Sequence, residues 1–66
     1  MSPRQFAMRV RQIRDDREMT QEALAKKAGV SRAYLSRLEM GRHDPPLSRL
    51  RKLAAALKVP IERLVK

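Results

Sequence analysis

Apolar residues recur every three or four positions along most of this chain, with polar residues between them. This spacing places the apolar side chains on one face of a helix. Two segments show it most clearly, one with Phe6, Val10 and Ile13 and the other with Leu47, Leu50, Leu53, Ala54 and Leu57. Because we find no strand pattern, the sequence predicts an all-α fold.

Capping residues indicate where the first two helices begin. A Ser-Pro-Arg-Gln run at residues 2–5 combines an N-cap, a proline in the first turn and the glutamine of a capping box. The first helix is therefore expected to run from Pro3 to about Arg17. A second helix over residues 21–28 follows the N-cap Thr20.

Glycine and proline separate the remaining helices. Gly29 stands where the second helix must stop, in a left-handed conformation that is cheap only for glycine. Ser31 then caps a third helix over residues 32–40. A proline pair marks a loop, after which we expect a fourth helix over residues 47–57 and a short fifth one near the end of the chain.

The segment from Thr20 to Glu39 is the most informative part of the pattern. Its two short helices are joined by the tight turn Ala28-Gly29-Val30-Ser31. Two helices joined by a short turn that contains glycine form a helix-turn-helix, whose second helix fits the major groove of B-DNA, about 12 Å wide. The pattern therefore indicates DNA as the first partner to test.

Composition supports an anionic partner and excludes several kinds of site. The 66 residues, which we treat as one domain over 1–66, carry 16 Lys and Arg against 7 Asp and Glu, a formal net charge of +9. The chain has no cysteine, and the lone His43 has too few carboxylates near it for a zinc site, so we expect no metal and no cofactor. Without a Gly-rich phosphate loop or a nucleophile at catalytic spacing from His43, we do not expect an enzyme.

The choice among anionic partners depends on the aromatic residues. One Tyr, one Phe and no Trp are too few for the stacking platforms that bind RNA or single strands. Double-stranded DNA is therefore favoured. No apolar stretch is long enough for a signal peptide or a membrane span, so we expect no membrane partner and a cytoplasmic location.

A helical wheel predicts which face of the third helix is free. With Leu35 at the centre of the buried face, Ala33, Ser36 and Arg37 fall roughly 100–200° away and point outward. Arg32 lies in the first turn, which enters the groove most deeply. Arginine can bind guanine through two hydrogen bonds, and alanine can meet a thymine methyl. We predict that these four residues read bases. Phosphate contact or simple exposure is the alternative for the two arginines, and phosphate contact is the alternative for Ser36.

Three further residues are candidates for phosphate contacts. Gln21 lies at the start of the second helix, where free N–H groups and a partial positive charge suit an anion. Arg42 projects from the loop after the third helix. Tyr34 lies at the margin of the buried face, where packing is the favoured role and a contact from its hydroxyl to a phosphate is the second.

Several short motifs occur together in this chain. They are Ile13-Arg14, Thr20-Gln21-Glu22-Ala23-Leu24-Ala25, Ala28-Gly29-Val30-Ser31, Tyr34-Leu35-Ser36-Arg37-Leu38-Glu39, Gly41-Arg42, and the run from Leu50 to Val59. With these motifs the chain resembles the lambda repressor/Cro-type helix-turn-helix family, also called the xenobiotic-response-element regulators. The resemblance runs from about Val10 to Val65 and implies a five-helix domain that binds operators as a homodimer.

The resemblance also implies roles for individual positions. Arg32, Ala33 and Arg37 fall where base contacts are usual in the family, and Gln21 falls where a phosphate contact is usual. The third helix, from Ser31 onward, is then the one that lies in the major groove.

One pair of residues and two kinds of difference from the family pattern concern the fold rather than DNA recognition. Arg14 and Glu39 fall where relatives form an interior ion pair between the first and third helices. Glu18 and Lys58 stand where relatives commonly have glycine. A serine cap is common at two positions that here are Pro46 and Pro60.

We expect a sequence-specific transcriptional regulator, such as a repressor, that binds an inverted-repeat operator as a homodimer with helix 32–40 in the major groove. One short helix makes too few base contacts, whereas two half-sites about 34 Å apart supply enough. Three apolar residues near the C-terminus are candidates for the dimer surface, with closure of the monomer core as an equal alternative: Ile61, Leu64 and Val65.

Two other functions remain open. The chain could be a protein-interaction module, such as an antitoxin that neutralises a partner protein, with DNA binding secondary. The sequence does not identify such a partner, which could be a toxin or RNA polymerase. A generic basic protein that coats nucleic acid is the third possibility, and it would not distinguish an operator from random DNA.

Overall fold

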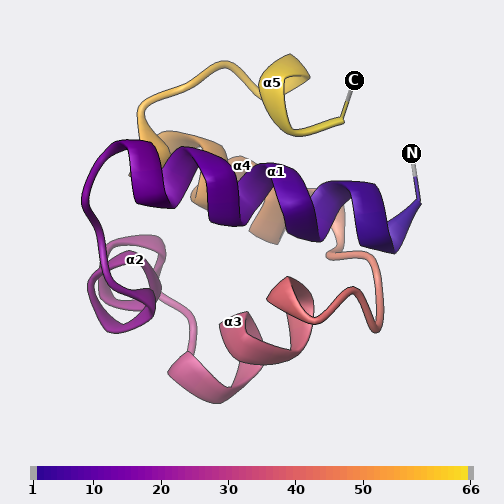
Figure 1. Cartoon of the computed structure of the whole chain (residues 1–66), viewed down its shortest axis with the longest axis horizontal. Coiled ribbons are helices and arrows are strands. Elements are labelled where there is room, and N and C mark those ends of the chain that lie inside the picture. The colour runs from indigo at the N-terminus through magenta and orange to yellow at the C-terminus, as the bar shows by residue number, and fades with distance from the viewer. Residues whose placement is uncertain (1, 66) are drawn as a thin grey trace.

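The computed structural model describes residues 2–65, which contain five α-helices joined by short loops. They are α1 (Pro3–Asp16), α2 (Gln21–Ala28), α3 (Arg32–Glu39), α4 (Leu47–Leu57) and α5 (Glu62–Val65). Figure 1 shows α1 in front of α4, with α2 and α3 below α1 and α5 above it. The predicted all-α fold with five helices is confirmed.

Side-chain caps begin the first three helices as predicted. The hydroxyl of Ser2 accepts from the backbone N–H of Gln5 at 3.1 Å, and the Gln5 side chain accepts from the Ser2 N–H at 3.3 Å. The hydroxyls of Thr20 and Ser31 cap α2 and α3 in the same way, each at 3.0 Å. Pro46 precedes α4 and makes no such bond, because its side chain has no acceptor.

Helix ends follow the predictions closely. The ends of α2 and α4 are where the sequence places them, while α1 stops one residue earlier, at Asp16, and α3 stops at Glu39. Arg17 and Met40 still donate their N–H groups to carbonyls of the preceding turn, so these two helices end gradually.

The apolar faces of the helices meet in one core. α1 packs on α3 and α5, and α2 packs on α3 and α4. The largest side chains that are fully buried come from every helix: Phe6, Val10, Leu24, Leu35, Leu38, Leu53, Leu57 and Leu64. This packing leaves the polar faces of all five helices in solvent.

The prediction that Leu64 contributes to a dimer surface is wrong. Its side chain is 0% exposed and belongs to the core, where α5 packs against α1. A partner chain cannot reach a side chain that its own chain covers completely. Ile61 and Val65 are only partly buried against the core, so their place in a dimer remains a prediction.

A residue with positive φ lies one or two positions after the end of each of α1 to α4. Glycine fills this place after α2 (Gly29, φ 71°) and after α3 (Gly41, φ 74°), whereas Glu18 (φ 54°) and Lys58 (φ 58°) fill it after α1 and α4. At each end, this residue and the next one donate N–H groups to carbonyls of the last turn. A side chain in this left-handed conformation costs about 1–2 kcal/mol.

We expect Glu18→Gly to raise the free energy of unfolding by about 0.5–1 kcal/mol. Glycine removes the strain of the left-handed backbone, and its greater freedom in the unfolded chain offsets part of that gain. Urea denaturation followed by circular dichroism measures the change. Glu22→Gly, the same substitution inside α2, should instead destabilise the protein. A loss of stability in both variants would show that Glu18 is not strained.

Candidate nucleic-acid interface

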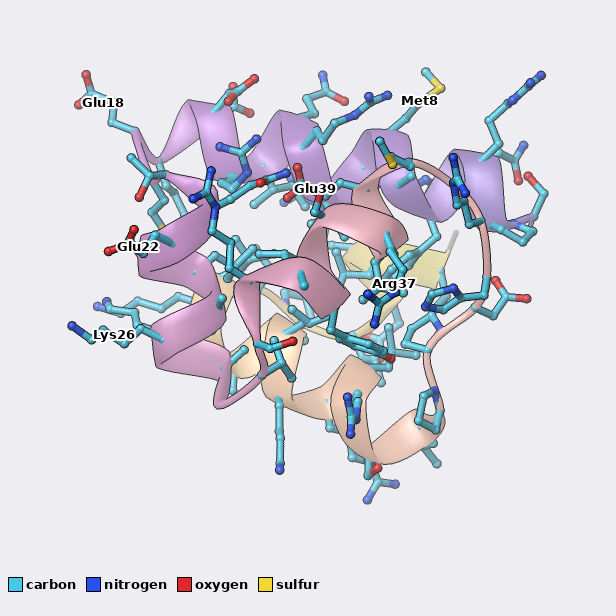
Figure 2. The ribbon with its side chains drawn as sticks, turned by 90° about the horizontal axis from the view of Figure 1, so that it is seen from below. Met8, Glu18, Glu22, Lys26, Arg37 and Glu39 are labelled. Atoms are coloured by element: carbon cyan, nitrogen blue, oxygen red, sulfur yellow. The ribbon has the colours of Figure 1, made fainter. Side chains whose placement is uncertain are left out.

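The outward face of α3 is fixed by the residues on its inner face. Leu35 and Leu38 are fully buried, so the side chains opposite them must point to solvent. Accordingly, Arg32, Ala33 and Arg37 are exposed. The fourth predicted base-reading residue, Ser36, is half-buried at the edge of this face. Figure 2 looks onto this side of the molecule, with Arg37 lying in front of the core.

A buried network ties α3 to α1 and α2. The Glu39 carboxylate, only 3% exposed, accepts from Arg14 Nε at 2.9 Å and from Arg14 Nη2 at 3.1 Å. It also accepts from Gln21 Nε2 at 3.1 Å. The remaining Arg14 nitrogen, Nη1, donates to the Met19 carbonyl at 2.8 Å. Sequence reasoning anticipated the pair of Arg14 and Glu39 but not the part that Gln21 plays.

This network fixes the orientation of α3 relative to α1 and α2. A planar guanidinium held by two bonds to one carboxylate allows little rotation of either group. Because Gln21 begins α2 and Glu39 ends α3, their bond also fixes the start of α2 relative to α3. Gln21, the candidate for a phosphate contact, and the base-reading candidates on α3 are thus held on one rigid unit. The phosphate role of Gln21 itself stays a prediction.

An aromatic cluster holds the loop that follows α3. The ring centroids of Tyr34 and His43 lie 5.6 Å apart, and the guanidinium carbon of Arg49 lies 4.4 Å from the centre of the Tyr34 ring. The Tyr34 hydroxyl is buried and has no hydrogen-bond partner among residues 2–65. Tyr34 thus packs, the role that the helical wheel favoured, and in this conformation a phosphate cannot reach its hydroxyl. Arg42, in the same loop, is exposed.

Two residues of the candidate interface were not selected from the sequence: Arg49, in the aromatic cluster, and Met40, directly after α3. Arg49 is exposed and lies over Tyr34, so a cation–π contact holds it beside α3. Met40, at the end of α3, is 64% exposed. The helical wheel does place Met40 outward, but no sequence pattern indicates that Arg49 meets Tyr34.

The charge on this face is of one sign. Glu39 is the only acidic residue of α3, and it is buried against Arg14. The exposed charges of α3 are therefore the two guanidinium groups of Arg32 and Arg37, which favour an anionic partner. Among residues 2–65, no group of His, Asp and Glu side chains could hold a metal ion. None of the helices described is long and apolar enough to cross a membrane.

Comparisons with known proteins agree with this geometry. The helix-turn-helix family model HTH_3 matches residues 10–64. The immunity repressor protein of Bacillus phage phi105 is 42% identical over 57 residues, which are 86% of this chain and 40% of that protein. The transcriptional repressor RghR of Bacillus subtilis is 41% identical over 61 residues, which are 91% of this chain and 45% of that protein. This chain thus spans less than half the length of these relatives.

Solved structures show the same fold. The restriction-modification controller protein C.AhdI of Aeromonas hydrophila superposes with a TM-score of 0.91 at 32% identity, over 94% of each chain. The hypothetical transcription factor NHTF from Neisseria superposes with a TM-score of 0.93 at 33% identity, over all of this chain and 76% of its own. Sequence and structure together show that this chain belongs to the helix-turn-helix family of transcriptional regulators and repressors, as its resemblance to the lambda repressor/Cro type implied.

Proposed function

We propose that this chain is a sequence-specific regulator of transcription that binds an inverted-repeat operator as a homodimer, with α3 in the major groove. The observation that carries the proposal is the exposed face of α3. Arg32 and Arg37 point outward from a helix that buried leucines and the Arg14–Glu39 pair hold in place. Arginines on such a rigid helix are suited to the bidentate recognition of guanine.

Charge and relatives support the same proposal. A formal net charge of +9 favours association with the phosphate backbone, which supplies much of the affinity of such proteins for DNA. The relatives are named transcriptional repressors and regulators, and the structure of C.AhdI is that of a controller protein. An enzymatic role has no comparable support.

The proposal of a dimer follows from the size of the interface. α3 has eight residues, too few for one copy to distinguish an operator from the rest of a genome. Two copies related by a two-fold axis would place their α3 helices in successive major grooves, about 34 Å apart. Ile61, just before α5, and Val65, at its end, are only partly buried and are our candidates for the contact between the two copies.

Selection of bound sites from a library of random duplexes tests the proposal. We expect an inverted repeat to be enriched, with guanine in each half-site and a spacing of about one helical turn between half-site centres. Sedimentation of the chain with the enriched duplex should give two chains per duplex. Enrichment of no motif at all would instead indicate a protein that coats DNA without reading it.

We expect Gln21→Ala to weaken binding to the enriched operator and to random duplex alike, by about 1.5–3 kcal/mol, the range for a hydrogen bond to a charged group. A phosphate contact carries no sequence information, so the ratio of the two affinities should not change. Fluorescence anisotropy titrations at one salt concentration measure both. Because Gln21 also donates to Glu39, urea denaturation must first show that the variant is folded. A change in base preference would contradict the phosphate role.

A further inference from the structure

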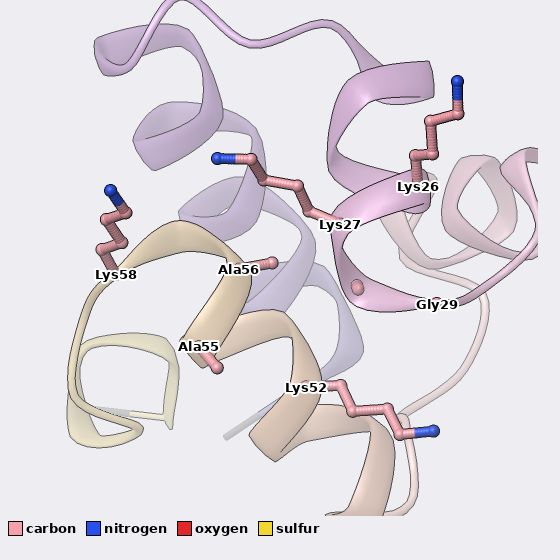
Figure 3. Close-up of a pocket in the computed structure, with 8 residues that line it drawn as sticks. Lys26, Lys27, Gly29, Lys52, Ala55, Ala56 and Lys58 are labelled. Atoms are coloured by element: carbon pink, nitrogen blue, oxygen red, sulfur yellow. The ribbon is translucent and has the colours of Figure 1, made fainter.

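A groove between the C-terminal ends of α2 and α4 lies outside the interface described above. Four lysines line it: Lys26, Lys27, Lys52 and Lys58. The rest of its lining consists of Ala28, Gly29, Ala55 and Ala56, and its volume is about 510 Å³. Figure 3 shows the lysine side chains spreading outward around these small residues. We call this the lysine groove; in size it matches ordinary ligand sites.

Within residues 2–65, no ion pair neutralises the charge of the lysine groove. No carboxylate lines the groove, and none of its four lysines forms an ion pair with the residues that the structure describes. Glu22, one turn before Lys26 on α2, does not pair with it either. Four ammonium groups around one depression repel one another, and an anionic group placed among them would relieve that repulsion.

The favourable effect of lysine near a helix C-terminus explains only part of this arrangement. Lys26, Lys27 and Lys58 lie at the ends of α2 and α4, where a positive charge interacts well with the helix dipole. Lys52 lies in the middle of α4, where that interaction is absent. Lys58 has φ 58°, a conformation that glycine adopts more easily, yet the chain has a lysine there whose side chain joins the groove.

We propose that the lysine groove binds an acidic segment of a partner protein. Carboxylates of the segment would pair with the four ammonium groups, and its apolar side chains would lie on the methyl groups of Ala55 and Ala56. The small residues let a peptide backbone come close, which a groove lined with large side chains would prevent. Acidic residues separated by small or apolar ones are therefore the expected sequence of the partner segment.

The position of the groove favours a protein over duplex DNA as its occupant. In Figure 2, Lys26 projects from α2 toward the side of the molecule, away from Arg37. In Figure 3, the groove opens between α2 and α4, and its four lysine side chains point in different directions into solvent. A chain that holds DNA through α3 would thus leave the groove free. This inference goes beyond the proposed function, because it gives the DNA-bound chain a site for a second macromolecule.

A titration of the ¹⁵N-labelled chain with a twelve-residue peptide of alternating Asp, Leu, Glu and Ala tests this inference. We expect the largest amide shifts at Ala28, Gly29, Ala55 and Ala56, and the same shifts when a random duplex already saturates the chain. The matched peptide with Asn and Gln in place of Asp and Glu should not bind. Lys27→Gln/Lys52→Gln should weaken binding of the acidic peptide about three- to tenfold, because two exposed ion pairs are lost.

Arg11→Gln/Arg51→Gln is the matched control, since it removes the same charge from exposed positions outside the groove. It should change the affinity for the acidic peptide by less than about twofold. Two outcomes would overturn the inference. In one, the shifts occur at Arg32 and Arg37 and the duplex displaces the peptide, which would mean that the peptide binds the DNA-binding face of α3 and not the lysine groove. In the other, the peptide does not bind and the lysine variant loses affinity for random duplex, so the groove is a phosphate contact.

Discussion

Arg14→Met is expected to lower the free energy of unfolding by about 3–5 kcal/mol, because it strands the charge of its partner Glu39. The Glu39 carboxylate is 3% exposed and would keep only the Gln21 amide as a donor. A 66-residue domain of ordinary stability has about 3–10 kcal/mol in total, so this one change removes much of it. Urea denaturation at low temperature, followed by circular dichroism, measures the loss.

Two further variants separate the stranded charge from lost packing. Arg14→Met/Glu39→Met removes both charges and should recover most of the stability, since apolar residues can replace a buried ion pair at little cost. Arg11→Met, an exposed change on the same helix, should stay within about 0.5 kcal/mol of the native protein. A double variant as unstable as Arg14→Met would mean that the ion pair does not explain the effect.

The second large effect concerns recognition. Arg32→Ala/Arg37→Ala is expected to weaken binding to the enriched operator by about 2–6 kcal/mol, the sum of two bidentate contacts to guanine at about 1–3 kcal/mol each. Binding to random duplex should fall much less, because two of the 16 basic side chains contribute little to the total charge. Anisotropy titrations of both duplexes at one salt concentration give the two affinities.

The matched control removes two exposed arginines that lie outside α3. Arg11→Ala/Arg51→Ala lowers the net charge by the same amount, so it should weaken binding to the operator and to random duplex slightly and equally. The ratio of operator affinity to random affinity is therefore the quantity that distinguishes the two variants. If the α3 variant lost the same affinity on both duplexes, its arginines would bind phosphates.

Local signals in the sequence are enough to predict most of the fold. The bounds of α2 were predictable because Thr20 and Gly29 mark its two ends within a few residues. The outward face of α3 was predictable because Leu35 and Leu38 fix its buried side through helical periodicity alone. Glu18 and Lys58 stand where the resemblance places glycine, and both adopt the positive φ that glycine tolerates best.

Features that depend on tertiary packing were not predictable in this way. Leu64 is buried because α5 folds back on α1, and a helix of four residues has no periodicity that reveals its partner. The contacts that Tyr34 makes with His43 and Arg49 depend on the path of the loop after α3. The lysine groove joins residues of α2 and α4 that are far apart in the sequence. Each of these contacts exists only once the helices have assembled.

Methylation protection of guanine N7 on the enriched operator tests most directly whether the outward face of α3 reads bases. N7 lies in the major groove, and a bidentate arginine covers it. We predict protected guanines in two half-sites about 34 Å apart. Arg37→Ala should leave one of these guanines unprotected in each half-site while the phosphate contacts persist. Guanines that stay open to methylation with the native protein bound, or protection that Arg37→Ala leaves unchanged, would contradict the account.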